Sequence, residues 1–265
     1  MTLEADVRAI VSERPGTFGV YARNLGTGET LGLNPDRVMP TESTAKTFIL
    51  VHYAALVAAG SLDPSRRITL TADNKALGSG VLRFLAPGLQ PTLEDLAQLM
   101  IIVSDNLATA VVLREVGGAE AVNETMAAMG LPTAHVNPAF SHCDLISDEL
   151  FGTSTPRDLA EVYTHLDERC REILFHQQLV DFVPRHLPHS YQSKDFGFDM
   201  PARAYNKTGN GLGRCIDSGR FETDSATWIV AAMADDQQDF AIRPDDAAPS
   251  AFAAIGMLLY ERWGS

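Results

Sequence analysis

Runs of strand composition near both ends of the chain, bounded by turn residues, predict β-strands. Residues 17–24 have strand composition, glycines follow as a turn, and residues 29–33 return as a second strand, which together predict a hairpin. A helical pattern precedes the hairpin over residues 4–13. Three further strand runs follow late in the chain, at residues 202–207, 219–223 and 227–233. Five strands are therefore expected, two from the start of the chain and three from its end.

The middle of the chain carries helical periodicity and helix start signals. An apolar helix is expected to follow the pair Glu42-Ser43 and to end at Gly60. Thr92 stands three positions before Asp95, as in a capping box that opens a second helix. Further helices are expected at residues 106–116, 119–129, 155–166 and 247–263, the third with Pro156 near its amino terminus.

This order of elements predicts an α+β fold with one antiparallel five-stranded sheet flanked by helices. The first and last segments share the sheet, and an all-helical lobe is inserted between them. We expect a single unit over residues 1–265, with a sheet lobe of residues 1–36 and 190–265 and a helical lobe of residues 37–189. No internal repeat, low-complexity tract or linker interrupts the pattern.

Length, composition and charge narrow the class of partner. The 265 residues, 45% hydrophobic and 21% charged, suffice for a full buried core. The net charge of −13 disfavours nucleic acid and an anionic membrane surface as partners, because both would repel the chain. A small anionic ligand stays compatible with this charge, since a local pair of cations dominates its own surroundings.

The cysteines and histidines do not form a recognisable metal or redox pattern. Cys143, Cys170 and Cys215 lack C-x-x-C spacing, so neither a disulfide framework nor a zinc site is expected. The histidines lack metal-ligand spacing and no glycine-rich phosphate loop occurs, so no metal, nucleotide or redox cofactor is expected. The amino terminus is acidic and carries no leader pattern, which predicts a cytoplasmic protein, or a periplasmic or secreted one if a signal peptide has been removed.

The string Ser43-Thr44-Ala45-Lys46 combines a hydroxyl and an amine one helical turn apart. Ser43 and Lys46 are expected to share one face of a helix. A serine hydroxyl becomes a nucleophile only with a base in hydrogen-bond reach. Lys46 can be that base if burial and a second cation, for which Lys207 is the candidate, depress its pKa. By itself the string also fits an N-cap serine followed by a solvated lysine.

Two further strings supply groups that complement this pair. In Ser104-Asp105-Asn106, Ser104 would relay a proton, Asn106 would hydrogen-bond a substrate amide or Lys46, and Asp105 would cap the next helix. Taken alone, this string is a common helix cap. The third string, Lys207-Thr208-Gly209, ends a predicted strand and by itself fits a loop lysine beside a glycine turn.

Taken together and in this order, the strings resemble the S-x-x-K, S-D-N and K-T-G set of class A β-lactamases and their penicillin-binding relatives. The order of elements matches that fold too, so the resemblance covers nearly the whole chain. It implies an enzyme that forms an acyl-enzyme at Ser43 and pairs its substrate with the strand edge at Gly209. It also implies that Lys207 and Thr208 bind a substrate carboxylate, and that the N–H groups of Ser43 and Asn210 form an oxyanion hole.

Members of this family often place an arginine near the substrate carboxylate. Arg214 and Arg220 are the two candidates, and Arg220 is the better placed because it lies on the predicted adjacent strand. A plain surface arginine is an equal alternative at that position.

One expected part of the family pattern is absent. Class A β-lactamases carry an E-x-x-L-N segment whose glutamate activates the water that releases the acyl group, and none occurs between Leu131 and Pro156. Depending on the alignment, His142 or Ser147 falls where the glutamate belongs, and a loop histidine near neutral pH is a general base in principle. The nearby carboxylates are Asp144, Asp148 and Glu149.

These features predict a serine β-lactamase-like hydrolase whose acylation is better equipped than its deacylation. The expected substrate is a small carboxylate-bearing β-lactam, peptide or ester. Two alternatives stay open: a carboxypeptidase- or esterase-like relative, and a β-lactam-binding sensor that is acylated but deacylates poorly.

Overall fold

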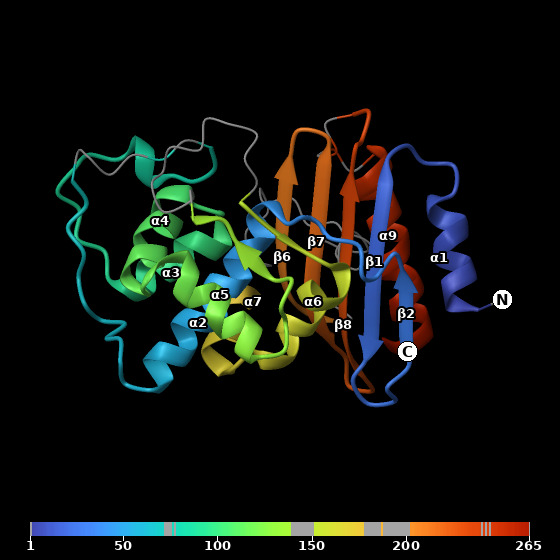
Figure 1. Ribbon diagram of the computed structural model, residues 1–265, viewed down its shortest axis with the longest axis horizontal. Helices are drawn as coiled ribbons and strands as arrows, with labels where there is room; N and C mark the ends of the chain where they lie inside the picture. The colour runs from blue at the N-terminus through green and yellow to red at the C-terminus, as the bar shows by residue number, and fades with distance from the viewer. Residues whose placement is uncertain are drawn as a thin grey trace.

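The computed structural model describes residues 2–71, 76, 78–138, 151–177, 187, 202–239, 241, 243 and 245–264. Its centre is a five-stranded antiparallel sheet in the order β2-β1-β8-β7-β6 (Figure 1). The strands are β1 Thr17–Asn24, β2 Thr30–Leu33, β6 Arg203–Gly211, β7 Arg214–Glu222 and β8 Thr227–Asp235. The predicted α+β fold with an antiparallel five-stranded sheet is confirmed.

The pairing of β1 with β8 joins the two ends of the chain in one sheet. Thr17 lies opposite Asp235 and Asn24 lies opposite Trp228, so the two strands pair along their full length. β8 is apolar on both faces: Ile229 and Met233 belong to the core of the helical side, and Trp228 to that of the opposite side. A strand covered on both faces reads as a continuous apolar run, as the sequence of β8 does.

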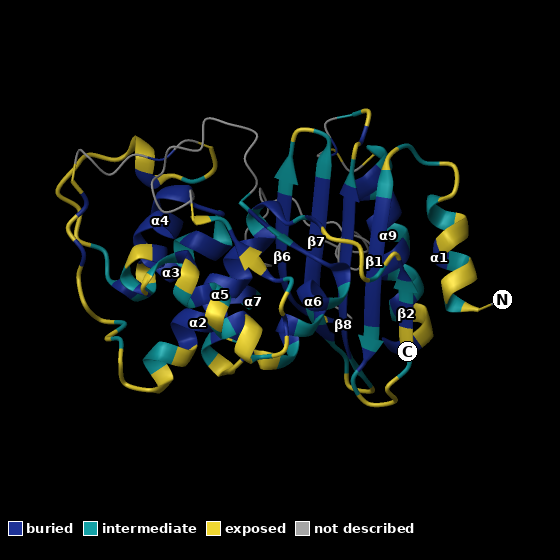
Figure 2. Cartoon of the chain, in the orientation of Figure 1, coloured by how far each residue is buried: buried dark blue, intermediate teal, exposed yellow. Residues whose placement is uncertain are grey.

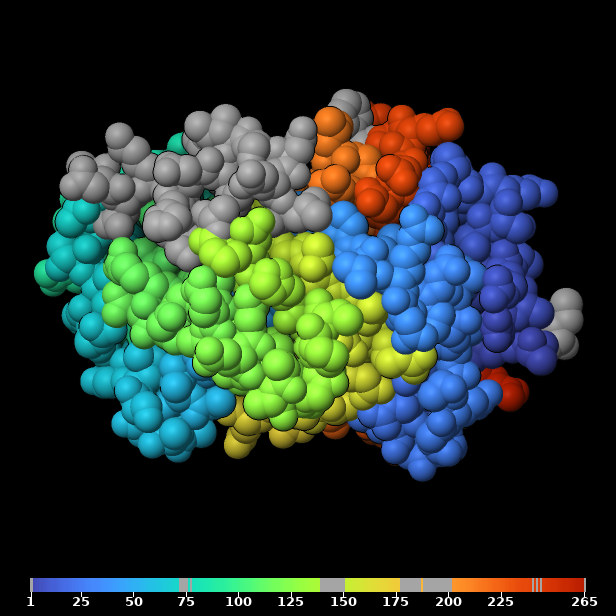
Figure 3. Space-filling view, in the orientation of Figure 1, coloured from blue at the N-terminus to red at the C-terminus, as the bar shows by residue number. Residues whose placement is uncertain are grey.

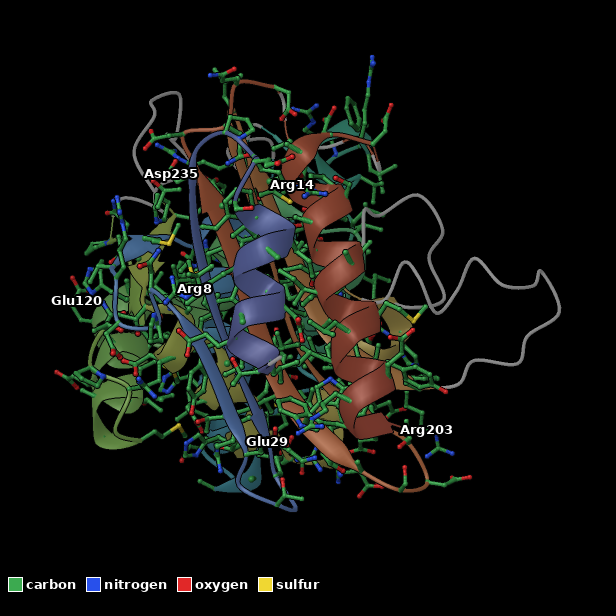
Figure 4. The ribbon with its side chains drawn as sticks, turned by 90° about the vertical axis from the view of Figure 1, so that its right-hand side faces the viewer. Arg8, Arg14, Glu29, Glu120, Arg203 and Asp235 are labelled. Atoms are coloured by element: carbon green, nitrogen blue, oxygen red, sulfur yellow. The ribbon has the colours of Figure 1, made fainter. Side chains whose placement is uncertain are left out.

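Two terminal helices cover one face of the sheet. α1 Leu3–Val11 and α9 Ala247–Leu259 lie side by side over it, as the turned view in Figure 4 shows. Arg14, just after α1, ties the two helices together by donating from Nε to the carbonyl of Ala247 at 3.0 Å. A short π-helical turn, η5 Tyr260–Gly264, ends the described chain.

The helical lobe covers the other face and is built around one buried helix. α2 Lys46–Ala58 is buried from its first residue to Ala54 and contacts α3, α4, α5 and α7. Figure 2 shows this burial as dark blue along α2 and the central strands, with exposed residues on the outer helices. The surrounding helices are α3 Leu93–Ile102, α4 Asn106–Glu115, α5 Gly118–Ala128, α6 Pro156–Glu161 and α7 Glu168–Gln177.

Local capping chemistry fixes several of these helix starts where the sequence predicted them. Thr92 and Asp95 form the expected capping box at α3. Thr155 caps α6, with Pro156 in the first turn. The single-turn elements are 3-10 helices: η1 Glu42–Ala45, η2 Leu82–Phe84 and η4 Val162–His165.

Some elements differ from the sequence expectation. β7 begins at Arg214, five residues before the predicted start, because polar residues such as Asp217 and Ser218 are buried in it. A small second sheet of β3 Met39–Pro40, β5 Gly152–Ser154 and β4 His135–Val136, and the helix α7, were not predicted. Figure 3 shows the blue segment that contains β3 lying against the yellow-green segment that contains β5. Among the described helices, none has the length and apolar character to cross a bilayer.

Candidate active site

Ser43 is the accessible point in a buried segment. From Thr41 to Ala54 every residue is buried except Ser43, which is partly exposed. Ser43 lies in η1, whose turn is closed when the backbone N–H of Lys46 donates to the carbonyls of Ser43 and Thr44. The first string thus sets an accessible hydroxyl one turn from a buried amine at the start of α2.

The amine of Lys46 joins the first string to the second. Its Nζ donates to the carbonyl oxygen of Ser104 at 2.7 Å, to Ser104 Oγ at 2.9 Å and to Asn106 Oδ1 at 2.8 Å. Lys46 is 1% exposed, and the ring of Phe151 lies 5.7 Å from Nζ. The structure therefore brings Lys46, Ser104 and Asn106 together, although about 60 residues separate them in sequence.

Burial and a second cation change the protonation of this amine. Burial lowers the pKa of Lys46 well below its ordinary value, the positive charge of Lys207 lowers it further, and Asp105 acts in the opposite direction. A lysine whose pKa is depressed in this way can hold a neutral amine near neutral pH, which is the form that accepts a proton.

The second string sits in a strained break between α3 and α4. Ser104 has φ +54°, in the left-handed region that non-glycine residues seldom adopt. Its backbone N–H donates to the carbonyl of Ile101, and that of Asn106 donates to the carbonyl of Ser79. Such strain persists only where the surroundings hold it, and here they hold Ser104 against Lys46.

Asp105 caps two elements at once. Its Oδ1 accepts from the N–H of Ala108 in α4, as predicted from the sequence, and its Oδ2 accepts from the N–H groups of Val81 and Leu82 at the start of η2. A Cβ at Gly80 would lie 2.3 Å from the carboxylate carbon of Asp105, so only glycine fits there. The middle residue of the string therefore ties residues 80–82 to the start of α4.

The third string lies on β6, the edge strand of the sheet, directly against η1. A Cβ at Gly209 would lie 2.9 Å from the backbone nitrogen of Ser43, which explains why glycine stands at this position. The two-residue turn after Gly211 makes Gly211 and Arg214 the closing pair of the hairpin. Alternate residues of the edge strand, among them Asn210, then direct their backbone groups toward its outer side.

Lys207 is the second buried amine of the site. It is 0% exposed, its Nζ donates to the carbonyl of Thr208 at 2.9 Å, and Thr208 is itself buried. Burial lowers the pKa of Lys207 to about 7, against the opposing effect of the Asp217 carboxylate. The effect of Lys207 on the pKa of Lys46 shows that the first and third strings act on each other electrostatically.

The structure does not bring Arg220 into this group, contrary to the sequence expectation. Arg220 lies opposite Tyr205 in the β6–β7 register, and its Nε donates to Glu222, toward the far end of β6 from Gly209. Arg214, the other candidate, lies beside η1 and pairs with Glu42. Arg220 lies away from Gly209 because the register of the β6–β7 hairpin pairs it with Tyr205 and pairs Arg214 with Gly211. A strand predicted to start at residue 219 does not define this register.

Two groups at the site were not found from the sequence. Glu42, directly before Ser43, is a buried carboxylate with φ +47°. The buried hydroxyl of Tyr163 lies 3.3 Å from Thr47 Oγ1 in α2 and 3.1 Å from Ser218 Oγ in β7. It therefore links α2 to the sheet at the residue that pairs with Lys207. Neither position carries a motif, so no local signal could have indicated them.

The residues considered for water activation lie outside the described part of the chain. These are His142, Asp144, Ser147, Asp148 and Glu149. Within the described ranges, no three histidine, cysteine or acidic side chains gather in a way that could hold a metal ion.

Comparison with known proteins identifies the family. A family model described as Beta-lactamase enzyme family matches residues 2–263. A β-lactamase of Streptomyces lavendulae is 30% identical over 166 residues, and one of Streptomyces albus G is 29% identical over 157 residues. These matches cover 60% and 56% of this chain, and the chain spans about half the length of these relatives, 54% and 49%.

Solved structures resemble the chain over nearly its full length. A β-lactamase from Sphaerobacter thermophilus DSM 20745 has a TM-score of 0.82 and 29% identity, covering 98% of this chain and 96% of that one. PBP-A has a TM-score of 0.81 and 26% identity, covering 98% and 95%. A mutant of PBP-A, at 27% identity and TM-score 0.81 with the same coverage, was solved as an acyl-enzyme complex with penicillin G.

Proposed function

The chain belongs to the β-lactamase enzyme family, and from this membership we propose that it is a serine hydrolase acylated at Ser43 by a β-lactam or a related amide or ester. The observation that carries the proposal is the buried amine of Lys46, which binds both Ser104 and Asn106 and has a depressed pKa. A general base needs the neutral amine that such a depressed pKa provides, and groups with strongly perturbed pKa values cluster at functional sites. The penicillin G complex of the PBP-A mutant supports a β-lactam as the acyl donor.

Acylation starts with proton transfer from Ser43. Neutral Lys46 keeps two N–H groups for the Ser104 carbonyl and Asn106 Oδ1, so its lone pair remains for a hydroxyl proton. As the proton leaves Ser43 Oγ for Lys46 Nζ, Oγ forms a bond to the substrate carbonyl carbon. The backbone N–H groups of Ser43 and Asn210 stabilise the negative charge on the carbonyl oxygen.

The tetrahedral intermediate then expels its nitrogen or oxygen leaving group. The carbon–nitrogen bond of a lactam breaks, and Ser104 Oγ donates a proton to the departing nitrogen. Ser104 recovers that proton from Lys46, which lies 2.9 Å away and took it from Ser43. One proton therefore moves from Ser43 through Lys46 and Ser104 to the leaving group, and the product is an ester of Ser43.

The edge strand β6 and the side-chain amide of Asn106 bind the substrate. A protonated Lys207 with the Thr208 hydroxyl binds the substrate carboxylate at β6. The outward carbonyl of Asn210, whose N–H belongs to the oxyanion hole, pairs with the substrate as an added strand. Asn106 already accepts from Lys46 through Oδ1, so its amide nitrogen is the group that meets a substrate carbonyl.

Release of the acyl group requires a water and a base. Water attacks the ester carbon, the bond to Ser43 Oγ breaks, and Oγ regains a proton. His142 and the carboxylates near it are the proposed bases. If none of them serves, two rivals fit better: a carboxypeptidase or esterase with a more labile acyl group, or a sensor that stays acylated.

One experiment separates these cases. The protein is mixed with excess chromogenic cephalosporin, and hydrolysis and intact mass are followed together. Steady turnover supports a β-lactamase, which would also raise antibiotic resistance when expressed in a susceptible host. A stoichiometric burst with a lasting adduct supports the sensor. The absence of both adduct and turnover would contradict β-lactam acylation and direct assays to esters and D-amino-acid peptides.

A further inference from the structure

Glu42 is a strained and buried carboxylate next to the nucleophile. It directly precedes Ser43, has φ +47° and is 6% exposed. A non-glycine residue takes this conformation at a cost, and a buried carboxylate needs a partner. Two unfavourable features at one position next to Ser43 call for a compensating contact.

Arg214 on β7 provides that contact. Its Nη1 donates to Glu42 Oε1 at 3.2 Å, and its Nε donates to Asp235 Oδ1 at 3.1 Å. Asp235, labelled in Figure 4, ends β8. The arginine fork therefore anchors Glu42 to two strands of the sheet and leaves its carboxylate little freedom.

The neighbouring hairpin is shaped around this carboxylate. A Cβ at Gly211 would lie 2.7 Å from both the carboxylate carbon and Oε1 of Glu42. Gly211 is also the hairpin partner of Arg214, so one closing pair contributes both the space and the cation. A carboxylate held in this way fixes the separation between η1 and the end of β6.

That separation determines the geometry of acylation. The backbone N–H of Ser43 comes from η1 and that of Asn210 comes from β6, next to Gly211. Resting on the proposed function, we propose that ionised Glu42, clamped by Arg214, is a positioning residue that holds these two N–H groups in register for the developing oxyanion. Oxyanion donors act only when preorganised, so loosening the clamp slows acylation and leaves substrate binding nearly unchanged.

The charges around Glu42 make the proposal testable by pH. Arg214 on β7 and Asp235 on β8 act on it directly. Of the other elements packed against η1, α2 carries the titratable group Lys46, and β6 carries Lys207 and Arg203. Burial outweighs Arg214 and raises the pKa of Glu42 above its ordinary value. Below that pKa the carboxyl is neutral and resembles a glutamine, so wild type and Glu42→Gln converge at acid pH.

The experiment measures the acylation rate and the substrate dissociation constant of wild type and Glu42→Gln by stopped flow with a chromogenic cephalosporin across pH. We expect about a tenfold slower acylation for Glu42→Gln above the pKa of Glu42, with the ratio falling toward one at acid pH. Arg214→Gln should cost about as much, and the double variant no more, because the pair acts as a unit. If either glutamine variant is unstable, Arg214→Lys is measured in its place. It keeps the positive charge and should therefore show an acylation rate between that of wild type and that expected for Arg214→Gln.

The matched control is Glu161→Gln, which removes a half-buried carboxylate paired with Arg23 outside the site. Its acylation rate should match wild type at every pH. Equal rates for Glu42→Gln and wild type throughout, or a deficit that does not change with pH, would overturn the proposal. A wild type that is never acylated would refute the proposed function itself, and with it this inference.

Discussion

Replacing Asp105 by alanine tests how the structure holds the second string in place. Asp105 is 1% exposed, and its carboxylate accepts three backbone hydrogen bonds, from Ala108 at 3.0 Å, Val81 at 2.6 Å and Leu82 at 2.9 Å. Alanine removes both acceptor oxygens and leaves three N–H groups at two helix starts without their partner. All three bonds run to the backbone at the start of η2 and α4, so we expect the loss of the side chain to affect folding first.

The magnitude follows from the number and kind of bonds. Loss of a helix N-cap costs about 1 kcal/mol. Each of the two other hydrogen bonds, made by an ionised group in a buried place, is worth about 1.5 kcal/mol or somewhat more. The free energy of unfolding should therefore fall by about 3–5 kcal/mol.

Urea unfolding followed by circular dichroism measures this loss. Asp105→Asn should fall between wild type and alanine, because Oδ1 can still accept from Ala108 while an NH₂ group faces two donors. Asp95→Ala is the control, since Asp95 accepts one backbone bond in an exposed capping box and its loss should cost about 1 kcal/mol or less. A loss below about 1 kcal/mol for Asp105→Ala would refute the reasoning.

Two further predictions concern the edge strand. Gly209→Ala would set a methyl group 2.8 Å from the Thr41 carbonyl oxygen and 2.9 Å from the Ser43 nitrogen. Acylation measured by stopped flow should therefore slow about 100-fold. An acylation rate near that of wild type would contradict the tight approach of β6 to η1. Lys207 has a pKa of about 7 and binds a carboxylate only when protonated, so the substrate dissociation constant should rise as pH increases above 7. In Lys207→Arg this rise should disappear, because guanidinium stays charged, and an unchanged rise would assign it to another group.

The sequence predicts the parts of the site whose signals are local. Ser43 and Lys46 are one turn apart in any helical conformation, and the Thr92 and Asp105 caps depend on side chains within three residues. The order of strand and helix patterns was enough to predict a sheet made from both ends of the chain.

Other parts depend on register and tertiary contact, which composition does not encode. The sequence pattern predicts the start of β7 five residues late, at residue 219, and for that reason favours Arg220 over Arg214. The turn at Leu212-Gly213, with Gly213 at φ +67°, fixes the pairing that places Arg214 beside η1. The left-handed conformation of Glu42 likewise has no sequence signal, since glutamate is not a residue that favours it.

Two buried amines with depressed pKa values, Lys46 and Lys207, lie in the site of Ser43, and lysine NMR tests this most directly. The chain has four lysines, Lys46, Lys75, Lys194 and Lys207, so side-chain carbon and nitrogen signals can be assigned by single Lys→Arg substitutions. A pH titration should show Lys207 changing charge near 7 and Lys46 losing its charge well below the ordinary range. If both signals titrate near 10.4, as exposed lysines do, Lys46 is charged at neutral pH and cannot be the base.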